Sequence, residues 1–276
     1  SNAISLIVSD ITNPFYPDLA RACQEVAQAR GYTVNIVNTD DEPDKMSEAL
    51  KQLRGGKVDG AVVTSALPDN REEIAQLLKE GYPLVLASRK LEDLEADSIV
   101  ADNKRGAMMA VNYLIGLGHR KIAFVNGVES SWINETRTEG YLQAMREAGL
   151  EVHPEWLTSG KARYEASYQT ARMLLSLPEE KRPTAILNLT DLGAFGVLDA
   201  AKDMGVAVPE ELAVIGFDDL FISGLRNIQL TTIRVPRHEM GRLATEMLFQ
   251  RMENKAAQPR SVVMPVELVI RKTCGG

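Results

Sequence analysis

The chain has 276 residues, 45% of them hydrophobic and 25% charged, which is typical of a globular protein long enough for two lobes with two cores. No apolar run approaches the ~20 residues of a membrane-spanning helix, which excludes an integral membrane protein. The net charge of −7, with no basic segment beyond His119-Arg120-Lys121, predicts that this polypeptide does not bind duplex DNA by itself.

The first part of the chain alternates between strand and helix patterns. Residues 1–3, Ser-Asn-Ala, are typical of the remnant of an expression tag. A first helix should carry Leu19, Cys23, Val26 and Ala29 on one face and stop at Gly31. Helix patterns follow at Asp44–Leu53 and after Asp69, where Asp69 and Glu72 form a capping-box pattern, and strands are expected at Ile4–Val8, Val34–Val37, Gly60–Thr64 and Leu84–Ala87.

The same alternation continues to the end of the chain. Pro236 opens a last helix, and Pro265 interrupts the final extended stretch, which indicates a crossing between two sheets because proline has no N–H. The succession implies right-handed crossovers and two doubly wound parallel sheets, an α/β fold. The other expected helices are Lys104–Leu117, Asn134–Ala148, Tyr164–Leu175 and Leu192–Met204, and the other strands are Lys121–Val125, Ala185–Asn188, Leu212–Ile215, Leu230–Ile233, Val262–Met264 and Val266–Ile270.

Five local motifs occur in one order along the whole chain. They are SDITNPFY at Ser9–Tyr16, GHRKIAF at Gly118–Phe124, RTEGY at Arg137–Tyr141, VPEELAVIGFDD at Val208–Asp219, and LTTI at Leu230–Ile233 followed by Pro236 and Met240-Gly241. Each is weak alone, but together they make the chain resemble the effector-binding part of LacI/GalR transcription regulators. The resemblance implies a periplasmic-binding-protein type I-like fold of two lobes joined by three crossovers, with residues 4–102 plus 236–264 in one lobe and 103–235 plus 265–276 in the other.

The resemblance also implies a ligand cleft at the carboxyl ends of the strands, the general ligand position of open α/β sheets. Arg137 and Asp218 are the strongest candidates, because arginine forks and carboxylates orient hydroxyl, carboxylate or phosphate groups. Arg137 could instead pair with Glu135 or Glu139 on a solvated helix face, and Asp218 could cap a turn. The full set of implied effector contacts is Asn13, Phe15, Tyr16, Ser88, Arg89, Trp132, Ile133, Arg137, Tyr164, Thr190, Asp218 and Val235, of which Phe15 and Tyr16 could be ordinary packing residues at a helix start.

The sequence departs from the family pattern within this set. Thr190 stands where asparagine is usual, Val235 where glutamine is common, and Ala162 where an aromatic ring often stacks on a sugar, with Tyr164 the nearest substitute. These departures put a standard hexose or pentose in doubt and leave a polar metabolite such as a polyol or sugar acid as an expected effector.

Motifs for catalysis and for metal binding are absent from the sequence. The three histidines have no metal-ligand spacing, Gly55-Gly56-Lys57 lacks the earlier glycine of a phosphate loop, and no Gly-x-Ser-x-Gly elbow occurs. Cys23 and Cys274 have no disulfide or zinc-like spacing and fit a reducing cytoplasm, although a periplasmic location stays open. We therefore expect no enzyme, no cofactor and no metal.

Two functions remain open at this point. The first is an allosteric regulator in which a small effector controls operator binding by an N-terminal helix-turn-helix headpiece upstream of this polypeptide. The alternative is a periplasmic solute-binding protein of a transporter. A homodimer favours the regulator, and the apolar residues Phe195, Phe221, Ile222 and Leu225, at positions expected to be exposed, predict its interface unless they pack within the lobe.

Overall fold

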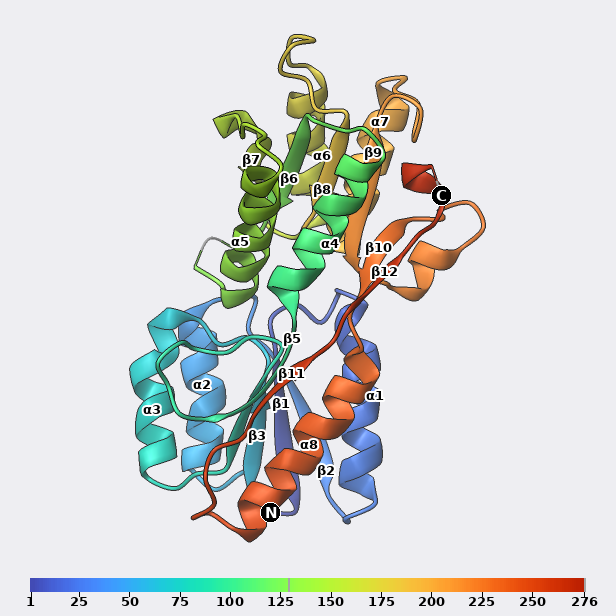
Figure 1. Cartoon of the computed structure of the whole chain (residues 1–276). Helices are drawn as coiled ribbons and strands as arrows, with labels where there is room; N and C mark the ends of the chain where they lie inside the picture. The colour runs from blue at the N-terminus through green and yellow to red at the C-terminus, as the bar shows by residue number, and fades with distance from the viewer. Residues whose placement is uncertain (129, 276) are drawn as a thin grey trace. The chain divides into compact units, whose positions relative to one another are not determined.

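The computed structural model describes residues 1–128 and 130–275 (Figure 1). The chain divides into two compact units: unit 1 comprises Ser1–Ala101 and Pro236–Met264, and unit 2 comprises Asp102–Val235 and Pro265–Gly276. The chain therefore passes from one unit to the other three times, after Ala101, Val235 and Met264. Each unit contains one six-stranded sheet with helices on both faces, which confirms the α/β class of two doubly wound sheets.

Unit 1 has an all-parallel sheet in the order β11-β5-β4-β3-β1-β2. Helices α2 and α3 cover one face of the sheet, and α1 and α8 cover the other (Figure 1). The bounds are β1 Ala3–Val8, α1 Phe15–Gln28, β2 Thr33–Asn38, α2 Pro43–Arg54, β3 Gly60–Val63, α3 Arg71–Lys79, β4 Leu84–Ala87, β5 Asp97–Ala101, α8 Arg237–Glu253 and β11 Ser261–Met264.

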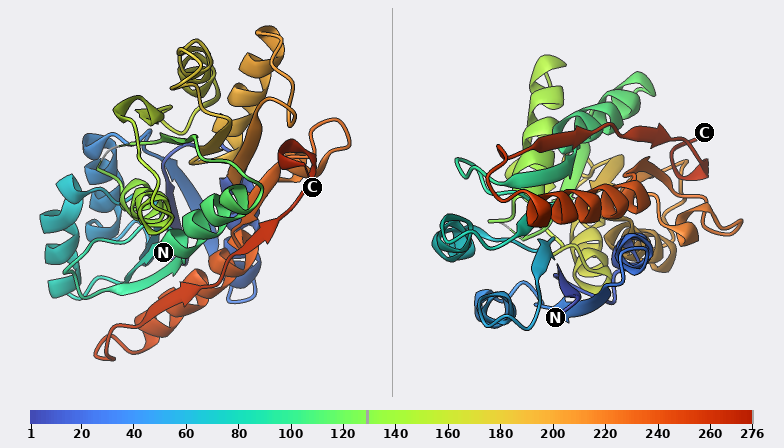
Figure 2. Two further views of the ribbon diagram at one scale, coloured as in Figure 1. Left: turned by 45° about the horizontal axis from the view of Figure 1, so that its top comes forward. Right: turned by 90° about the horizontal axis from the view of Figure 1, so that it is seen from below.

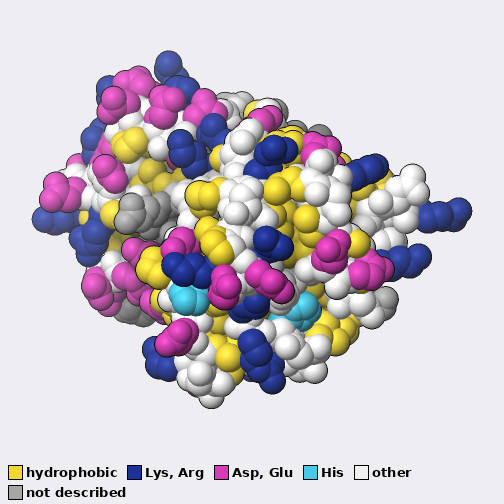
Figure 3. All heavy atoms as spheres, turned by 90° about the horizontal axis from the view of Figure 1, so that it is seen from above, with side chains coloured by type: hydrophobic (Ala, Val, Ile, Leu, Met, Phe, Trp, Pro, Cys, Tyr) yellow, Lys and Arg dark blue, Asp and Glu magenta, His cyan; other side chains and the backbone are white. Residues whose placement is uncertain are grey.

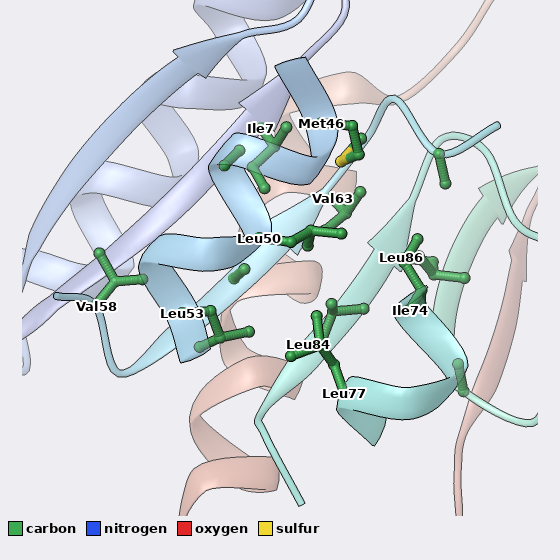
Figure 4. Close-up of a cluster of buried hydrophobic side chains, with 14 of the residues drawn as sticks. Ile7, Met46, Leu50, Leu53, Val58, Val63, Ile74, Leu77, Leu84 and Leu86 are labelled. Carbon is green, nitrogen blue, oxygen red and sulfur yellow. The ribbon is translucent and has the colours of Figure 1, made fainter. Parts of the chain in front are cut away.

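The core of unit 1 fills both faces of its sheet, since every residue of the strands β1, β3 and β4 is buried and all of them except Ser5 are apolar or glycine. On one face, side chains of α2 and α3 such as Leu50 and Ile74 meet Ile7, Val63 and Leu86 of the strands (Figure 4). On the other face, α1 and α8 pack against each other (Figure 2). The strands are thereby held rigidly, and only the loops at their ends are free to vary.

Unit 2 repeats the architecture with the strand order β12-β10-β9-β8-β6-β7, parallel except for β12 against β10. Helices α4 and α5 pack together, as do α6 and α7. The bounds are α4 Asn103–Gly116, β6 Ile122–Asn126, α5 Trp132–Glu147, β7 Leu157–Ser159, α6 Tyr164–Leu175, β8 Ala185–Asn188, α7 Asp191–Asp203, β9 Ala213–Asp218, a 3-10 turn at Phe221–Gly224, β10 Thr231–Arg234 and β12 Glu267–Val269.

Most expected elements are confirmed to within two residues, but four details are wrong. The capping box does not form: Asp69 lies in a 3-10 turn at Pro68–Asn70, and α3 begins at Arg71 without a side-chain cap. Helix α1 ends at Gln28, so Ala29 is exposed and lies beyond the buried face. Strands β5 and β7 were not predicted, and β9 extends three residues further than expected, to Asp218.

Strand β5 escaped prediction because it begins with two polar residues. Asp97 and Ser98 are nevertheless buried. Asp97 accepts hydrogen bonds from the Arg251 guanidinium at 2.7 and 3.2 Å and from the Arg260 N–H at 2.8 Å, while Ser98 bonds to Ser261 at 2.9 Å. These partners lie about 160 residues further along the chain. Burial of polar groups is tolerated here because they are hydrogen-bonded.

Across the described residues, no helix is both long and apolar enough to cross a membrane.

Candidate functional site

In each unit, the implied effector contacts lie at or after the carboxyl ends of parallel strands, in the loops there or in the first turns of the helices that follow. In unit 1 they follow β1 and β4, and in unit 2 they follow β8, β9 and β10 or lie in the first turns of α5. Ligands of open α/β sheets bind at this edge because the loops there vary while the strands stay fixed.

The loop after β1 is built around two buried rings. Phe15 and Tyr16 are each 6% exposed and form an edge-to-face pair with centroids 5.2 Å apart. The Tyr16 hydroxyl lies 2.5 Å from Ser9 Oγ, and the Asn13 side-chain oxygen accepts a hydrogen bond from the Phe15 N–H at 3.0 Å. Both rings therefore pack at the start of α1, and their contact with an effector stays a prediction.

Arg89, after β4, is held by a carboxylate that the sequence did not suggest. Its two terminal guanidinium nitrogens donate to the Asp41 carboxylate at 2.5 and 3.2 Å. Burial opposes the charge of the guanidinium, but the hydrogen bonds and charge of Asp41 outweigh this, and the pKa of Arg89 lies above its ordinary value. Ser88, with a φ of +67°, turns the chain so that Arg89 meets Asp41.

In unit 2, Arg137 is buried rather than solvated. Its Nε donates to the Asn103 side-chain oxygen at 3.0 Å, and Nη1 donates to the Leu189 carbonyl at 2.5 Å. The guanidinium carbon lies 3.6 Å from the centroid of the Phe217 ring. Pairing with Glu135 or Glu139 on a solvated face is therefore wrong for Arg137. Its contacts fix the guanidinium beside the ends of β8 and β9.

Asp218 ends β9 and has an unusual backbone. Its φ is +135°, and Asp219 follows with a φ of +58°, conformations that non-glycine residues rarely adopt. Asp219 accepts from the Arg234 Nε at 2.8 Å and from the Arg271 Nη2 at 2.7 Å, so it is the centre of an ion-pair network. Strained backbone held by its surroundings is common at binding sites. Asp218 itself is buried as the last residue of β9.

Four further expected contacts lie after strands of unit 2 or in the first turn of α5. The Val235 N–H lies 3.4 Å from the Asp218 carbonyl, and Val235 is buried. Thr190 caps α7: its hydroxyl accepts from the Gly193 N–H at 3.0 Å, a typical use of threonine before a helix. Trp132 and Ile133 lie in the first turn of α5, about one helical turn before Arg137, and both are half-buried.

Tyr164 begins α6 and packs along the α6–α7 pair. Its hydroxyl donates to the carboxylate of Asp199, and its ring stacks near that of Tyr168 with centroids 6.4 Å apart. Asp199 lies two turns into α7, away from the strand end where that helix begins. The expected use of Tyr164 in place of the missing stacking aromatic stays a prediction.

Asp191, the first residue of α7, was not among the expected site residues. It is fully buried and accepts hydrogen bonds from the Ser223 hydroxyl at 2.5 Å, the Thr232 hydroxyl at 2.6 Å and the Leu220 N–H at 2.9 Å. Burial raises the pKa of Asp191, and the three hydrogen bonds oppose this rise. Asp191 thereby ties α7 to β10 and to the loop after β9.

The four residues expected at a dimer interface differ in exposure. Phe221 is 82% exposed, Leu225 42% and Ile222 38%, whereas Phe195 is half-buried on α7. Packing within the lobe therefore does not account for the three residues of the 3-10 turn region. Large apolar side chains are rarely left this open in a lone surface loop.

A two-unit α/β fold with polar residues gathered at the strand carboxyl ends of each unit is the arrangement of the periplasmic-binding-protein class. The sequence profile described as "Periplasmic binding proteins and sugar binding domain of LacI family" matches residues 1–272. The chain therefore belongs to the LacI family.

Similar proteins are transcription regulators. Catabolite control protein A of Priestia megaterium is 32% identical over 274 residues, covering 99% of this chain and 82% of that protein. The HTH-type transcriptional repressor CytR of Escherichia coli K12 is 33% identical over 272 residues, covering 98% of this chain and 79% of the repressor. These relatives favour a regulator over a transporter component.

Solved structures agree with this assignment. A LacI family transcriptional regulator from Lactobacillus casei with bound sucrose has a TM-score of 0.86 at 28% identity, covering 98% of this chain and 99% of that one. The transcriptional regulator CelR in complex with cellobiose has a TM-score of 0.89 at 25% identity, covering 99% of this chain and 84% of that one.

Proposed function

We propose that this chain is the effector-sensing and dimerising part of a LacI-family transcription regulator. It binds a small polar metabolite of the sugar, polyol or sugar-acid kind, and this binding controls operator recognition by a helix-turn-helix headpiece. Lys and Arg side chains are interspersed with Asp and Glu side chains on the face drawn in Figure 3, which fits DNA contact through the headpiece alone. A regulator of this kind acts in the cytoplasm, without a cofactor and without catalysis.

The observation that carries the effector proposal is the presence of two buried polar residues at the strand ends of unit 2. Arg137 is held by Asn103, the Leu189 carbonyl and the Phe217 ring, and Asp218 is the buried last residue of β9. Groups that are already ordered lose little conformational entropy on binding. A carboxylate is a strong acceptor for hydroxyl groups, so a hydroxylated ligand suits this site.

Asp218→Ala is expected to weaken effector binding about 10- to 150-fold, the loss of one charge-assisted hydrogen bond of ~1.5–3 kcal/mol. The effector is first found by calorimetric titration with a panel of sugars, polyols and sugar acids, and the variant is then titrated with it. Asp69→Ala, which removes an exposed carboxylate from the turn before α3, is the matched control and should bind normally. Unchanged affinity in a folded Asp218→Ala protein would mean that the site lies elsewhere.

Arg137→Ala is a less specific test of the same site. The side chain is only 3% exposed, and its removal leaves the buried Asn103 without its donor. A loss of stability is therefore expected together with any loss of affinity.

The dimerisation proposal rests on the exposed apolar residues Phe221, Ile222 and Leu225, which lie close together in sequence after β9. A second copy of the chain is the partner that would bury them in a symmetric interface.

Phe221→Ser is expected to raise the dissociation constant of the dimer about 30-fold, because an interface aromatic typically contributes ~2 kcal/mol. Sedimentation equilibrium over a range of protein concentrations measures this change. Leu117→Ser, at an exposed apolar residue at the end of α4, is the control and should leave the dimer intact. A wild-type chain that stays monomeric at tens of micromolar would contradict the proposal.

A further inference from the structure

The pair formed by Arg89 and Asp41 crosses the carboxyl edge of the sheet in unit 1. Arg89 follows β4 and Asp41 follows β2, and the sheet order β4-β3-β1-β2 places two strands between them. Three strand spacings amount to ~14 Å. The loop after β2 and the long Arg89 side chain together span this distance.

The backbone is unusual at or beside both partners. Asp40 and Asp41 have φ values of +53° and +56°, and Ser88 has +67°. Such conformations cost energy in non-glycine residues and persist where the surrounding structure requires them. The bidentate ion pair is the contact that this geometry produces.

Two polar groups at the same strand ends remain without a hydrogen-bond partner within the described part of the chain. One is the Nε of Arg89, whose side chain is 9% exposed, and the other is the Oγ of Ser65, which lies two residues after β3 and is 1% exposed. By strand register, Ser65 and Arg89 follow neighbouring strands, since Val63 pairs with Leu86. A buried donor and a buried hydroxyl without partners are costly unless a ligand or water completes them.

The charge of Arg89 is balanced by Asp41 before any ligand binds. Both terminal nitrogens of Arg89 are engaged by Asp41, so the fork that would receive a ligand's carboxylate or phosphate is already filled. An anionic group would also approach the Asp41 carboxylate and be repelled by it. The hydrogen-bonding groups left over, an N–H and a hydroxyl, are suited to neutral hydroxyl or carbonyl groups.

We propose that Asp41 is a specificity-determining residue: by occupying the anion position on Arg89, it makes unit 1 select an uncharged, hydroxyl-bearing part of the effector and reject an anionic one. The inference rests on the proposed function and narrows it, because it excludes an acidic group at this end of the ligand.

Formate tests this directly, since it is a carboxylate small enough to take the place of the Asp41 side chain. Thermal unfolding is followed in formate and in chloride at equal ionic strength for wild type, Asp41→Ala, Arg89→Gln and the double variant Asp41→Ala/Arg89→Gln. We expect formate to stabilise Asp41→Ala with an apparent affinity at least ~10-fold above that of wild type, the effect of one charge-assisted bond. The double variant should lose this response.

Asp40→Ala is the matched control. It removes the same charge from the neighbouring residue, whose carboxylate pairs with Lys45 at 2.8 Å, and should show no formate response. Three results would overturn the proposal. The first is stabilisation of wild type by formate that is lost in Arg89→Gln. The second is a folded Asp41→Ala protein that formate does not stabilise, and the third is an Asp40→Ala protein that formate stabilises as much as it stabilises Asp41→Ala.

If Asp41→Ala does not fold, wild type is compared with Arg89→Gln. Melting temperatures that formate leaves unchanged in both proteins support the proposal, and stabilisation of wild type that is lost in Arg89→Gln refutes it. The formate test needs no effector. A failed search for an effector would therefore count against the proposed function but would not affect the formate result.

Discussion

Replacing Asp191 by alanine is expected to lower the free energy of unfolding by about 4 kcal/mol, because a buried carboxylate at the centre of a hydrogen-bond network is removed. The variant leaves the Leu220 N–H and the hydroxyls of Ser223 and Thr232 without their acceptor. Breaking one side of such a network costs the full desolvation of the groups left behind. Chemical denaturation measured with wild type and variant in parallel gives the difference.

The control for this experiment is Asp203→Ala at the other end of the same helix. Asp203 accepts a hydrogen bond from the Tyr168 hydroxyl at an exposed position. Its replacement by alanine should therefore lower the free energy of unfolding by less than ~1 kcal/mol. The loop anchored by Asp191 also carries the exposed Phe221, so weaker dimerisation of Asp191→Ala is expected together with the loss of stability. A difference below ~1 kcal/mol between the two variants would show that Asp191 does not organise this loop.

The second large effect is expected for Gly140→Ala, at about 3 kcal/mol of lost stability. Gly140 lies on α5 where that helix meets α4. A Cβ at this position would lie 2.3 Å from the Lys104 carbonyl oxygen and 2.9 Å from the Ala107 Cβ. The obstacle is mostly backbone, so α4 and α5 must separate, and the contacts on either side are lost with them.

Gly116→Ala separates this clash from the ordinary effect of placing alanine in a helix. Gly116 ends α4, is exposed, and a Cβ there meets nothing within 4 Å. We expect a gain of ~0.4–1 kcal/mol, because alanine loses less backbone entropy on folding. Thermal or denaturant unfolding of both variants checks the opposite signs. Equal effects of the two substitutions would contradict the close approach of α4 and α5.

The sequence by itself determined the alternation of elements and many of their bounds. Strands β4 and β8 and helix α6 begin and end at the expected residues, and Pro265 lies between β11 and β12, which belong to different sheets. These features follow from local causes: apolar runs, helical periodicity, glycine stops and the missing N–H of proline. The five motifs likewise indicated the protein family from the sequence, because each is a short stretch of neighbouring residues.

The tertiary structure alone decided which polar groups meet. Arg89 was expected at a strand end, but its role follows from Asp41, 48 residues earlier in the chain. Arg137 is buried and donates hydrogen bonds to Asn103 and to the Leu189 carbonyl, and the Tyr164 hydroxyl donates to Asp199. Periodicity in the sequence indicates which face of an element is buried. The partner of a charged side chain depends instead on how distant segments of the chain pack together. This pairing determines whether the side chain can still bind a ligand.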